Sequence, residues 1–164
     1  MANKLWFLKN KANGELLSPW HDLEIEPANG EENCVTGVIE MPGNTGSKLE
    51  CSKKDINNPV TQDVVINKNT KAHMLRTFKN PPTFNYGFIP RTWSDNELGG
   101  DCDPIDLVDL GWRNIKQTLA VSDYLVLGTL GLVDQGELDI KVLAIEAIEA
   151  NELGIKTLKD FERL

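Results

Sequence analysis

The segment GGDCDPIDLVDL, residues 99–110, places four aspartates within nine positions: Asp101, Asp103, Asp106 and Asp109. Carboxylates at this density repel one another unless positive charge lies among them. Carboxylate oxygens are also the ligands that hard divalent cations, Mg²⁺ above all, take in proteins. The segment therefore suggests a metal site, although an acidic loop exposed to solvent has the same composition.

Two other kinds of metal site are not expected. A calcium-binding EF-hand loop starting at Asp101 needs Gly at its sixth position and Glu at its twelfth, where this chain has Asp106 and Trp112. The two histidines, His21 and His73, lie far apart and the three cysteines are irregularly spaced, so neither a zinc site nor a disulfide framework is predicted.

Two further segments mix acids and lysines around a turn. DQGELDIK, residues 134–141, has two aspartates and one lysine, and VIEMPGNTGSKLE, residues 38–50, has Glu40, Lys48 and Glu50. Three such segments make sense together if metal ions and a phosphate group lie between them. We therefore expect the three segments to meet in one site.

Strand geometry predicts which of these side chains share a face. Side chains alternate along a strand, so residues two apart point the same way. Lys48 should therefore lie beside Glu50, and Lys141 beside Asp139. Asp106 and Asp109 are three apart and should point opposite ways, which predicts that only Asp106 belongs with Asp101 and Asp103.

The elements that must position these residues are mostly strands. Short runs rich in β-branched or aromatic residues are CVTGVIEM, SKLEC, PVTQDVVI, FNYGFIP and PIDLVDL. Two longer runs, residues 124–133 and 138–145, flank the turn at 134–137 and predict a hairpin. Helical periodicity is found only in TLKDFERL, where Thr157 is a suitable N-cap. The pattern indicates a mostly β domain with added helix, folded as a barrel.

Length and composition narrow the class of protein. A chain of 164 residues and 18.3 kDa suits one domain spanning residues 1–164. The apolar runs are too short for a membrane span or a secretory signal, which makes a cytoplasmic protein without a membrane partner the expectation. The net charge of -8 argues against a nucleic-acid partner, because phosphate backbones repel an acidic surface.

Seven blocks of the sequence resemble a known family. They are SPWHD, VIEMP, SKLE, NPVTQD, NYGFIPRTW, GDCDPID and DQGELDIK. Their order and spacing are similar to those of soluble family I inorganic pyrophosphatases, in particular the eukaryotic subgroup, from about Gly14 onward. The resemblance implies a five-stranded, OB-like β-barrel (mostly β with added helix, α+β) that hydrolyses inorganic diphosphate with Mg²⁺.

The resemblance also implies roles for individual residues. It implies that Asp101, Asp103 and Asp106 hold a pair of metal ions and the water between them, and that Asp134, Asp139 and Glu50 extend the metal site. We expect Asp103 to orient or deprotonate that water. The residues that contact phosphate are Lys48, Tyr86 and Lys141, with Arg76 as the candidate for an arginine that the family places upstream of NYG. Glu40 and Asp63 have supporting roles.

Three departures from the family pattern leave two functions open. The segment between Arg76 and Tyr86 is shorter than usual, Pro82 stands where the family has a tyrosine, and the chain is C-terminally short, ending at Leu164. One expectation is hydrolysis of diphosphate, the small-molecule substrate, by a Mg²⁺-activated water. The alternative is a catalytically impaired metal- or phosphate-binding relative that acts through a partner. The resemblance also allows a homodimer.

Overall fold

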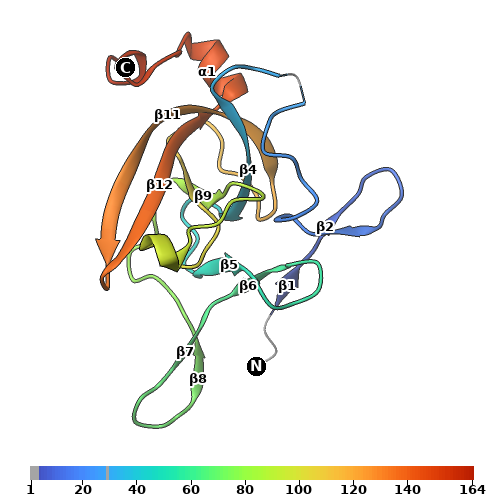
Figure 1. The fold of residues 1–164 in the computed structure, drawn as a ribbon, viewed down its shortest axis with the longest axis vertical. Coiled ribbons are helices and arrows are strands. Elements are labelled where there is room, and N and C mark those ends of the chain that lie inside the picture. Colours follow the sequence, from blue (N-terminus) through green and yellow to red (C-terminus); the bar gives the residue numbers. More distant parts are fainter. Residues whose placement is uncertain (1–3, 29) are drawn as a thin grey trace.

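The computed structural model describes residues 4–28 and 30–164, and five of its strands form a closed barrel (Figure 1). The strands are β4 (Cys34–Met41), β9 (Asn85–Phe88), β10 (Asp106–Asp109), β11 (Val121–Asp134) and β12 (Glu137–Glu146). Around the barrel they follow the order β10-β12-β11-β4-β9. The pair β10–β12 is parallel and the other pairs are antiparallel. The five-stranded, mostly β barrel expected from the sequence is confirmed.

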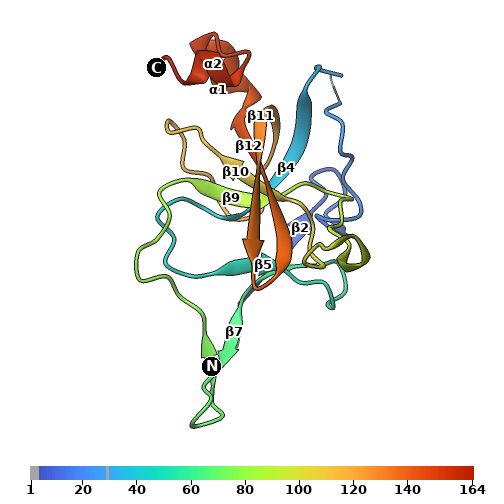
Figure 2. The same ribbon diagram turned by 60° about the vertical axis from the view of Figure 1, so that its left-hand side comes forward.

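Short strands form three small sheets outside the barrel. They are β1 (Leu5–Trp6), β2 (Leu8–Lys9), β3 (Leu16–Leu17), β5 (Leu49–Cys51), β6 (Val60–Gln62), β7 (Val64–Ile66) and β8 (His73–Leu75). Their pairings are β1-β6-β5, β2-β3 and β7-β8. The β7–β8 hairpin projects from the body of the molecule in both ribbon views (Figures 1 and 2).

The expected strand over residues 59–66 is divided in two. Its first part, β6, pairs with β5 and β1, whereas its second part, β7, pairs only with β8. Asp63 lies at the junction, where its amide donates to the Lys48 carbonyl and its own carbonyl accepts from the Arg76 amide. The change of partner at Asp63 ends one strand and begins the next.

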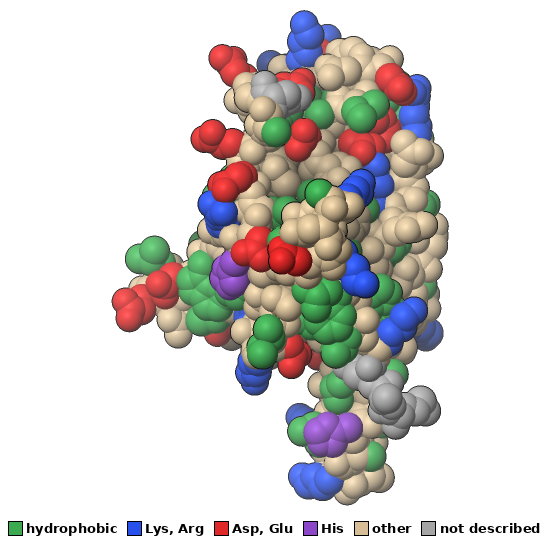
Figure 3. All heavy atoms as spheres, turned by 90° about the vertical axis from the view of Figure 1, so that its right-hand side faces the viewer, with side chains coloured by type: hydrophobic (Ala, Val, Ile, Leu, Met, Phe, Trp, Pro, Cys, Tyr) green, Lys and Arg blue, Asp and Glu red, His purple; other side chains and the backbone are tan. Residues whose placement is uncertain are grey.

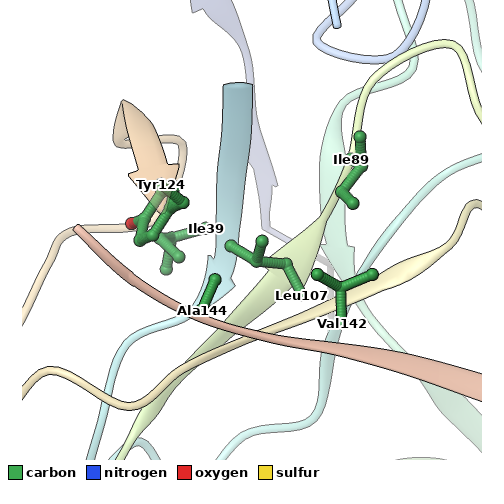
Figure 4. Packing of buried hydrophobic residues seen from close by; sticks show 6 residues of the cluster. All are labelled: Ile39, Ile89, Leu107, Tyr124, Val142 and Ala144. Carbon is green, nitrogen blue, oxygen red and sulfur yellow. The ribbon is translucent and has the colours of Figure 1, made fainter. Parts of the chain in front are cut away.

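Apolar side chains fill the barrel and anchor its strands. Figure 4 draws six of them: Ile39 on β4, Ile89 just after β9, Leu107 on β10, Tyr124 on β11, and Val142 and Ala144 on β12. A second cluster, made by Val38, Cys51 and Phe88, packs between the barrel and the segment that carries Trp20. Because β4 is covered on both faces, almost all of its residues are buried rather than every second one.

The helices differ from the expectation that only TLKDFERL is helical. The described elements include α1 (Ala147–Leu153), α2 (Leu158–Phe161) and a 3₁₀ turn, η1 (Asn96–Leu98). α1 follows β12 directly, and its N-cap, Glu146, makes no capping hydrogen bond, so the sequence contains no start signal. The cap at Thr157 is confirmed, since its hydroxyl accepts from the Asp160 amide in a capping box. α2 ends at Phe161, so the helix is shorter than the periodic run TLKDFERL, and Leu164 lies beyond it with its side chain exposed.

The surface mixes charged and apolar side chains. On the face drawn in Figure 3, hydrophobic side chains gather on the lower half, with acidic and basic groups around them. Cys34, Cys51 and Cys102 are free thiols, in keeping with the absence of a predicted disulfide framework. Over the described ranges, none of the helices has the length and apolar character needed to cross a membrane.

Candidate active site

All ten residues that the sequence singles out for catalysis or metal binding line one pocket of about 340 Å³. They are Lys48, Glu50, Arg76, Tyr86, Asp101, Asp103, Asp106, Asp134, Asp139 and Lys141. The supporting acid Glu40 lies in the same wall. The three mixed-charge segments therefore meet, as expected, although nothing in this convergence assigns a role to any one residue.

The register of the barrel strands places one cluster of the pocket. On the parallel strands β10 and β12, Asp106 pairs with Lys141, and Asp139 lies two residues before Lys141 on the same face. The Lys141 Nζ atom is 2.8 Å from Asp106, 2.9 Å from Asp139 and 2.8 Å from the Tyr86 hydroxyl oxygen. Tyr86, on the neighbouring strand β9, donates its own hydroxyl hydrogen bond to Asp106. One ammonium group thus lies among two carboxylates and a phenol.

Burial and charge act in opposite directions on this cluster. Burial raises the pKa of Asp106, and hydrogen bonds from Lys141 and Tyr86 only partly offset it. Burial lowers the pKa of Lys141, but hydrogen bonds to Asp106 and Asp139 outweigh burial, so the pKa lies above its ordinary value. Burial, followed by the Asp106 charge, raises the pKa of Tyr86, which keeps the phenol protonated as a hydrogen-bond donor.

A second wall of the pocket is built at the base of the β7–β8 hairpin. Lys48 lies 3.2 Å from Glu50, which confirms their shared face, and 3.4 Å from Asp63. Arg76 Nη1 lies 3.1 Å from the same Asp63 oxygen. Burial raises the pKa of Asp63, but the Arg76 and Lys48 contacts outweigh it and hold the pKa below its ordinary value. Asp63 therefore stays ionised and orients two cations that line the pocket.

Glu40 is the most deeply buried acid of the pocket wall, with 6% of its surface exposed. The Cys51 amide donates a hydrogen bond to its carboxyl group. Burial raises the pKa of Glu40 well above its ordinary value, and the charges of Asp106, Asp103 and Glu50 raise it further. Glu40 is therefore held as a neutral acid over a wider pH range than an exposed glutamate.

Asp109 points away from the pocket, as its spacing from Asp106 predicts. It is 1% exposed and accepts hydrogen bonds from Asn85 Nδ2 at 2.9 Å and from the Gly111 amide at 3.0 Å. Burial raises its pKa, against the effect of these two donors. Its contacts are those of a structural residue that ties β10 to β9 and to the following turn.

The two local departures from the family pattern have different outcomes. Arg76 lies in the pocket despite its short distance in sequence from Tyr86. Pro82 lies outside the lining residues, and its carbonyl accepts a hydrogen bond of 2.7 Å from the Asn44 amide. The loop between Arg76 and Tyr86 thus brings the arginine, but not the proline, to the site.

The donor set fits a hard divalent cation by its chemistry. All six predicted metal-site acids present carboxylate oxygens to one pocket: Glu50, Asp101, Asp103, Asp106, Asp134 and Asp139. Within residues 4–28 and 30–164, no three acid, histidine or cysteine side chains are already grouped tightly enough to hold one ion. Lysine ammonium groups lie against four of the six carboxylates instead, at Glu50, Asp103, Asp106 and Asp139.

Comparison with known proteins places this arrangement in a family. The family model described as inorganic pyrophosphatase matches residues 37–164. This chain belongs to the inorganic pyrophosphatase family. A curated relative, the inorganic pyrophosphatase of Mus musculus, is 36% identical over 165 residues, covering 96% of this chain and 55% of the relative. Membership of the family implies a divalent metal cofactor.

Solved structures agree with the family assignment. The crystal structure of type I inorganic pyrophosphatase from Toxoplasma gondii is 31% identical, with a TM-score of 0.81, over 99% of this chain and 76% of that one. A Trypanosoma cruzi vacuolar soluble pyrophosphatase, truncated in its N-terminal domain and crystallised with PPi, is 28% identical, with a TM-score of 0.80, over 99% of this chain and 65% of that one. The chain spans about half the length of the curated family relatives that it matches.

Lys53 is a residue at this site that sequence reasoning missed. Its Nζ atom lies 3.1 Å from Asp103. It stands in the polar run SKKD, where nothing distinguishes it from its neighbour Lys54. The contact arises from the fold, since the loop after β5 lies against the loop that carries Asp103.

Proposed function

We propose that this chain hydrolyses inorganic diphosphate to two phosphates with Mg²⁺ as cofactor. The observation that carries the proposal is the convergence of six carboxylates, two lysines, an arginine and a tyrosine in one pocket. Diphosphate is a strongly charged anion, so a site for it needs both cationic side chains and oxygen ligands for metal ions. The relative crystallised with PPi, in the same fold, supports diphosphate as the substrate.

In this proposal the cationic side chains bind the phosphate groups. Lys48, Arg76 and Lys141 direct ammonium or guanidinium groups into the pocket, and Tyr86 adds a neutral donor. Charged hydrogen bonds of this kind contribute about 1.5–3 kcal/mol each. They stabilise the charge that builds on the leaving phosphate when the bond to the bridging oxygen breaks.

The acids of the pocket have two roles in this proposal: five bind Mg²⁺, and one accepts a proton from the attacking water. Asp101, Asp106, Asp134, Asp139 and Glu50 would hold Mg²⁺, which when bound lowers the pKa of water and neutralises phosphate charge. Asp103 orients the attacking water and takes its proton as the oxygen forms a bond to phosphorus. The P–O bond to the second phosphate breaks in the same displacement, and that phosphate leaves.

Phosphate release from diphosphate tests the proposal directly. We expect Mg²⁺-dependent release from the wild-type chain and a fall of about 10²- to 10⁴-fold in Asp103→Asn, the range for loss of a general base. Asp123→Asn, which makes the same change of charge outside the pocket, is the matched control and should keep wild-type activity. A folded, Mg²⁺-binding chain that releases no phosphate would contradict hydrolysis and indicate the alternative, a binding protein that acts through a partner.

The cytoplasmic location and the homodimer belong to the same proposal. A close structural neighbour bears the name vacuolar soluble pyrophosphatase, so location is a property to measure in cells rather than to infer from the fold. Fractionation of cells into cytosol and membrane-bounded compartments tests the first expectation. Sedimentation equilibrium over a range of protein concentrations tests the second.

A further inference from the structure

Lys53 lies at the rim of the pocket and holds two adjacent residues of the loop formed by residues 100–103. Its Nζ atom is 3.1 Å from the Asp103 carboxylate and donates a hydrogen bond of 2.8 Å to the Cys102 carbonyl oxygen. Lys48 and Lys141 line the pocket, whereas Lys53 does not. Its ammonium group therefore contacts a residue of the pocket wall without lining the pocket itself.

The loop that Lys53 contacts has an unfavourable backbone conformation. Cys102 has a φ angle of 57°, in the left-handed region that residues with a side chain rarely adopt. Two backbone hydrogen bonds to Ser94 hold this conformation. The Cys102 amide donates to the Ser94 carbonyl, and the Ser94 amide donates to the Asp103 carbonyl, each at 2.8 Å. Lys53 adds two further polar contacts to the same two residues.

Glycine at position 100 permits the close approach of this loop to Ser94. A Cβ atom at Gly100 would lie 2.3 Å from Ser94 Oγ and 2.6 Å from the Ser94 carbonyl carbon. The loop is thus pressed against Ser94 before it reaches Asp103. The close approach restricts the backbone of the loop, and Lys53 contacts the Asp103 carboxylate that this backbone carries.

An aromatic stack fixes the position of Lys53 itself. Its Nζ atom lies 5.9 Å from the centre of the Trp93 ring, which is within the range of cation–π attraction. Trp93 stacks on Trp20 with ring centres 5.5 Å apart, and Trp20 Nε1 donates to the Thr92 carbonyl. Trp20 in turn packs on the buried cluster that contains Val38. Although Lys53 is exposed, these contacts connect its ammonium group to the barrel.

We propose that Lys53 is a positioning residue that holds the Asp103 carboxylate and its loop at the edge of the pocket. The inference rests on the proposed function only in so far as Asp103 takes part in the reaction; the bracing of the loop does not depend on it. Lys53 does not contact substrate in this proposal, so its loss should lower kcat and leave KM for diphosphate unchanged.

The test compares three variants of the full chain: Lys53→Met, Lys53→Arg and Lys54→Met. Lys54→Met removes the same charge one residue away, and in the part of the chain that the structure describes its ammonium group makes no such contact. Amide hydrogen exchange of Cys102 is followed by NMR, with Leu107 in the barrel core as the internal reference for unfolding of the whole molecule. Mg²⁺ binding is measured by calorimetric titration, and diphosphate hydrolysis by phosphate release.

We expect Lys53→Met to raise the Cys102 exchange rate and lower kcat by about 3- to 10-fold each, as for one partly exposed charged contact. Lys54→Met should match the wild type, and Lys53→Arg should restore both quantities because its guanidinium also donates to carboxylate and carbonyl oxygens.

Two results would overturn the inference. One is equal Cys102 exchange in Lys53→Met and Lys54→Met. The other is tighter Mg²⁺ binding in Lys53→Met with unchanged exchange, which would mean that Lys53 acts only through its charge. If the wild-type chain releases no phosphate, the proposed function fails, but the exchange comparison still decides whether Lys53 braces the loop.

Discussion

Lys141 Nζ lies 2.8 Å from the Asp106 carboxylate because these two residues are paired in register on the parallel strands β10 and β12. The same ammonium group reaches Asp139 on its own strand and the hydroxyl of Tyr86 on β9. The contact therefore depends on closure of the barrel and not on any local turn. It makes Lys141 the most constrained of the cationic side chains in the pocket.

Replacement of Lys141 should slow hydrolysis more than replacement of a surface lysine. In Lys141→Met the loss of one charged hydrogen bond, about 1.5–3 kcal/mol, predicts a fall in kcat/KM of about 10- to 150-fold. Steady-state kinetics with Mg²⁺ measures this, with Lys159→Met, an exposed lysine of α2, as control. A fall of less than twofold in Lys141→Met would show that this lysine does not contact the transition state.

Asp109 should affect stability without affecting the reaction. Asp109→Ala removes the acceptor of Asn85 Nδ2 and of the Gly111 amide, and buried donors left unpaired cost about 1–3 kcal/mol each. Urea unfolding should show a lower free energy of unfolding for Asp109→Ala. The increase in that free energy on addition of Mg²⁺ should be the same as in the wild type. Asp106→Ala is the contrast, because it should lose activity. An altered Mg²⁺ dependence in Asp109→Ala would place Asp109 in the site.

Gly87 should tolerate no side chain. A Cβ atom there would lie 1.8 Å from the Val38 carbonyl oxygen, so Gly87→Ala must separate β9 from β4. We expect a loss of more than about 3 kcal/mol of unfolding free energy, or no folded protein, by thermal unfolding or yield of soluble chain. Gly128→Ala is the control, since no atom lies within 4 Å of its Cβ position. Equal stability of the two variants would show that β9 and β4 can move apart.

Glu40 should make stability depend on pH in one direction. Its folded-state pKa is raised above the ordinary value of 4.5, mainly by burial. The stability that its neutral form contributes is therefore fully present below about pH 4.5 and is lost as pH rises through the raised pKa. A tenfold change in the dissociation constant of this acid between the folded and unfolded states corresponds to about 1.4 kcal/mol of unfolding free energy.

The variant Glu40→Gln isolates this effect, because an amide does not ionise and still accepts from the Cys51 amide. The unfolding free energy of Glu40→Gln minus that of the wild type, measured with a chelator present, should grow as pH rises. A difference that stays constant with pH would mean that Glu40 is not held neutral by the fold.

Magnesium should stabilise the folded chain. A ligand at 100 times its dissociation constant adds about 2.7 kcal/mol to the free energy of unfolding. The midpoint of thermal unfolding should rise with Mg²⁺ and fall again with a chelator. The double variant Asp101→Asn/Asp106→Asn should lose this rise in the unfolding midpoint, whereas Asp123→Asn should keep it. An equal rise in both would assign the effect to other sites.

The strands were predictable where pattern and turn chemistry agree. The run CVTGVIEM coincides with β4, and the turn at Asp134–Glu137 joins β11 to β12 as expected. α1 escaped prediction because its apolar residues continue those of β12 without a break or a capping signal. The hairpin partner β8 has only three residues, too few for any periodicity to show.

The pocket was predictable for a different reason. All of its predicted residues except Arg76 stand in short motifs whose order matches a family, so their convergence did not have to be derived from strand register. Lys53 belongs to no such motif, and its contact with Trp93, the last residue of NYGFIPRTW, depends on how two loops meet. Alternation along strands still separated Asp109 from Asp106, because that inference needs only the geometry of one strand.

Closure of the barrel also sets the order in which this site can form. β4 pairs with β11 and β9, and β10 pairs with β12, so strands from both halves of the chain must meet before the cluster of Tyr86, Asp106 and Lys141 exists. Contacts between distant segments form slowly, since loop closure costs entropy before any pairing compensates. During synthesis the cluster around Lys141 cannot assemble until β12 has been made. In refolding, we expect this cluster to recover only once β12 has paired with β10.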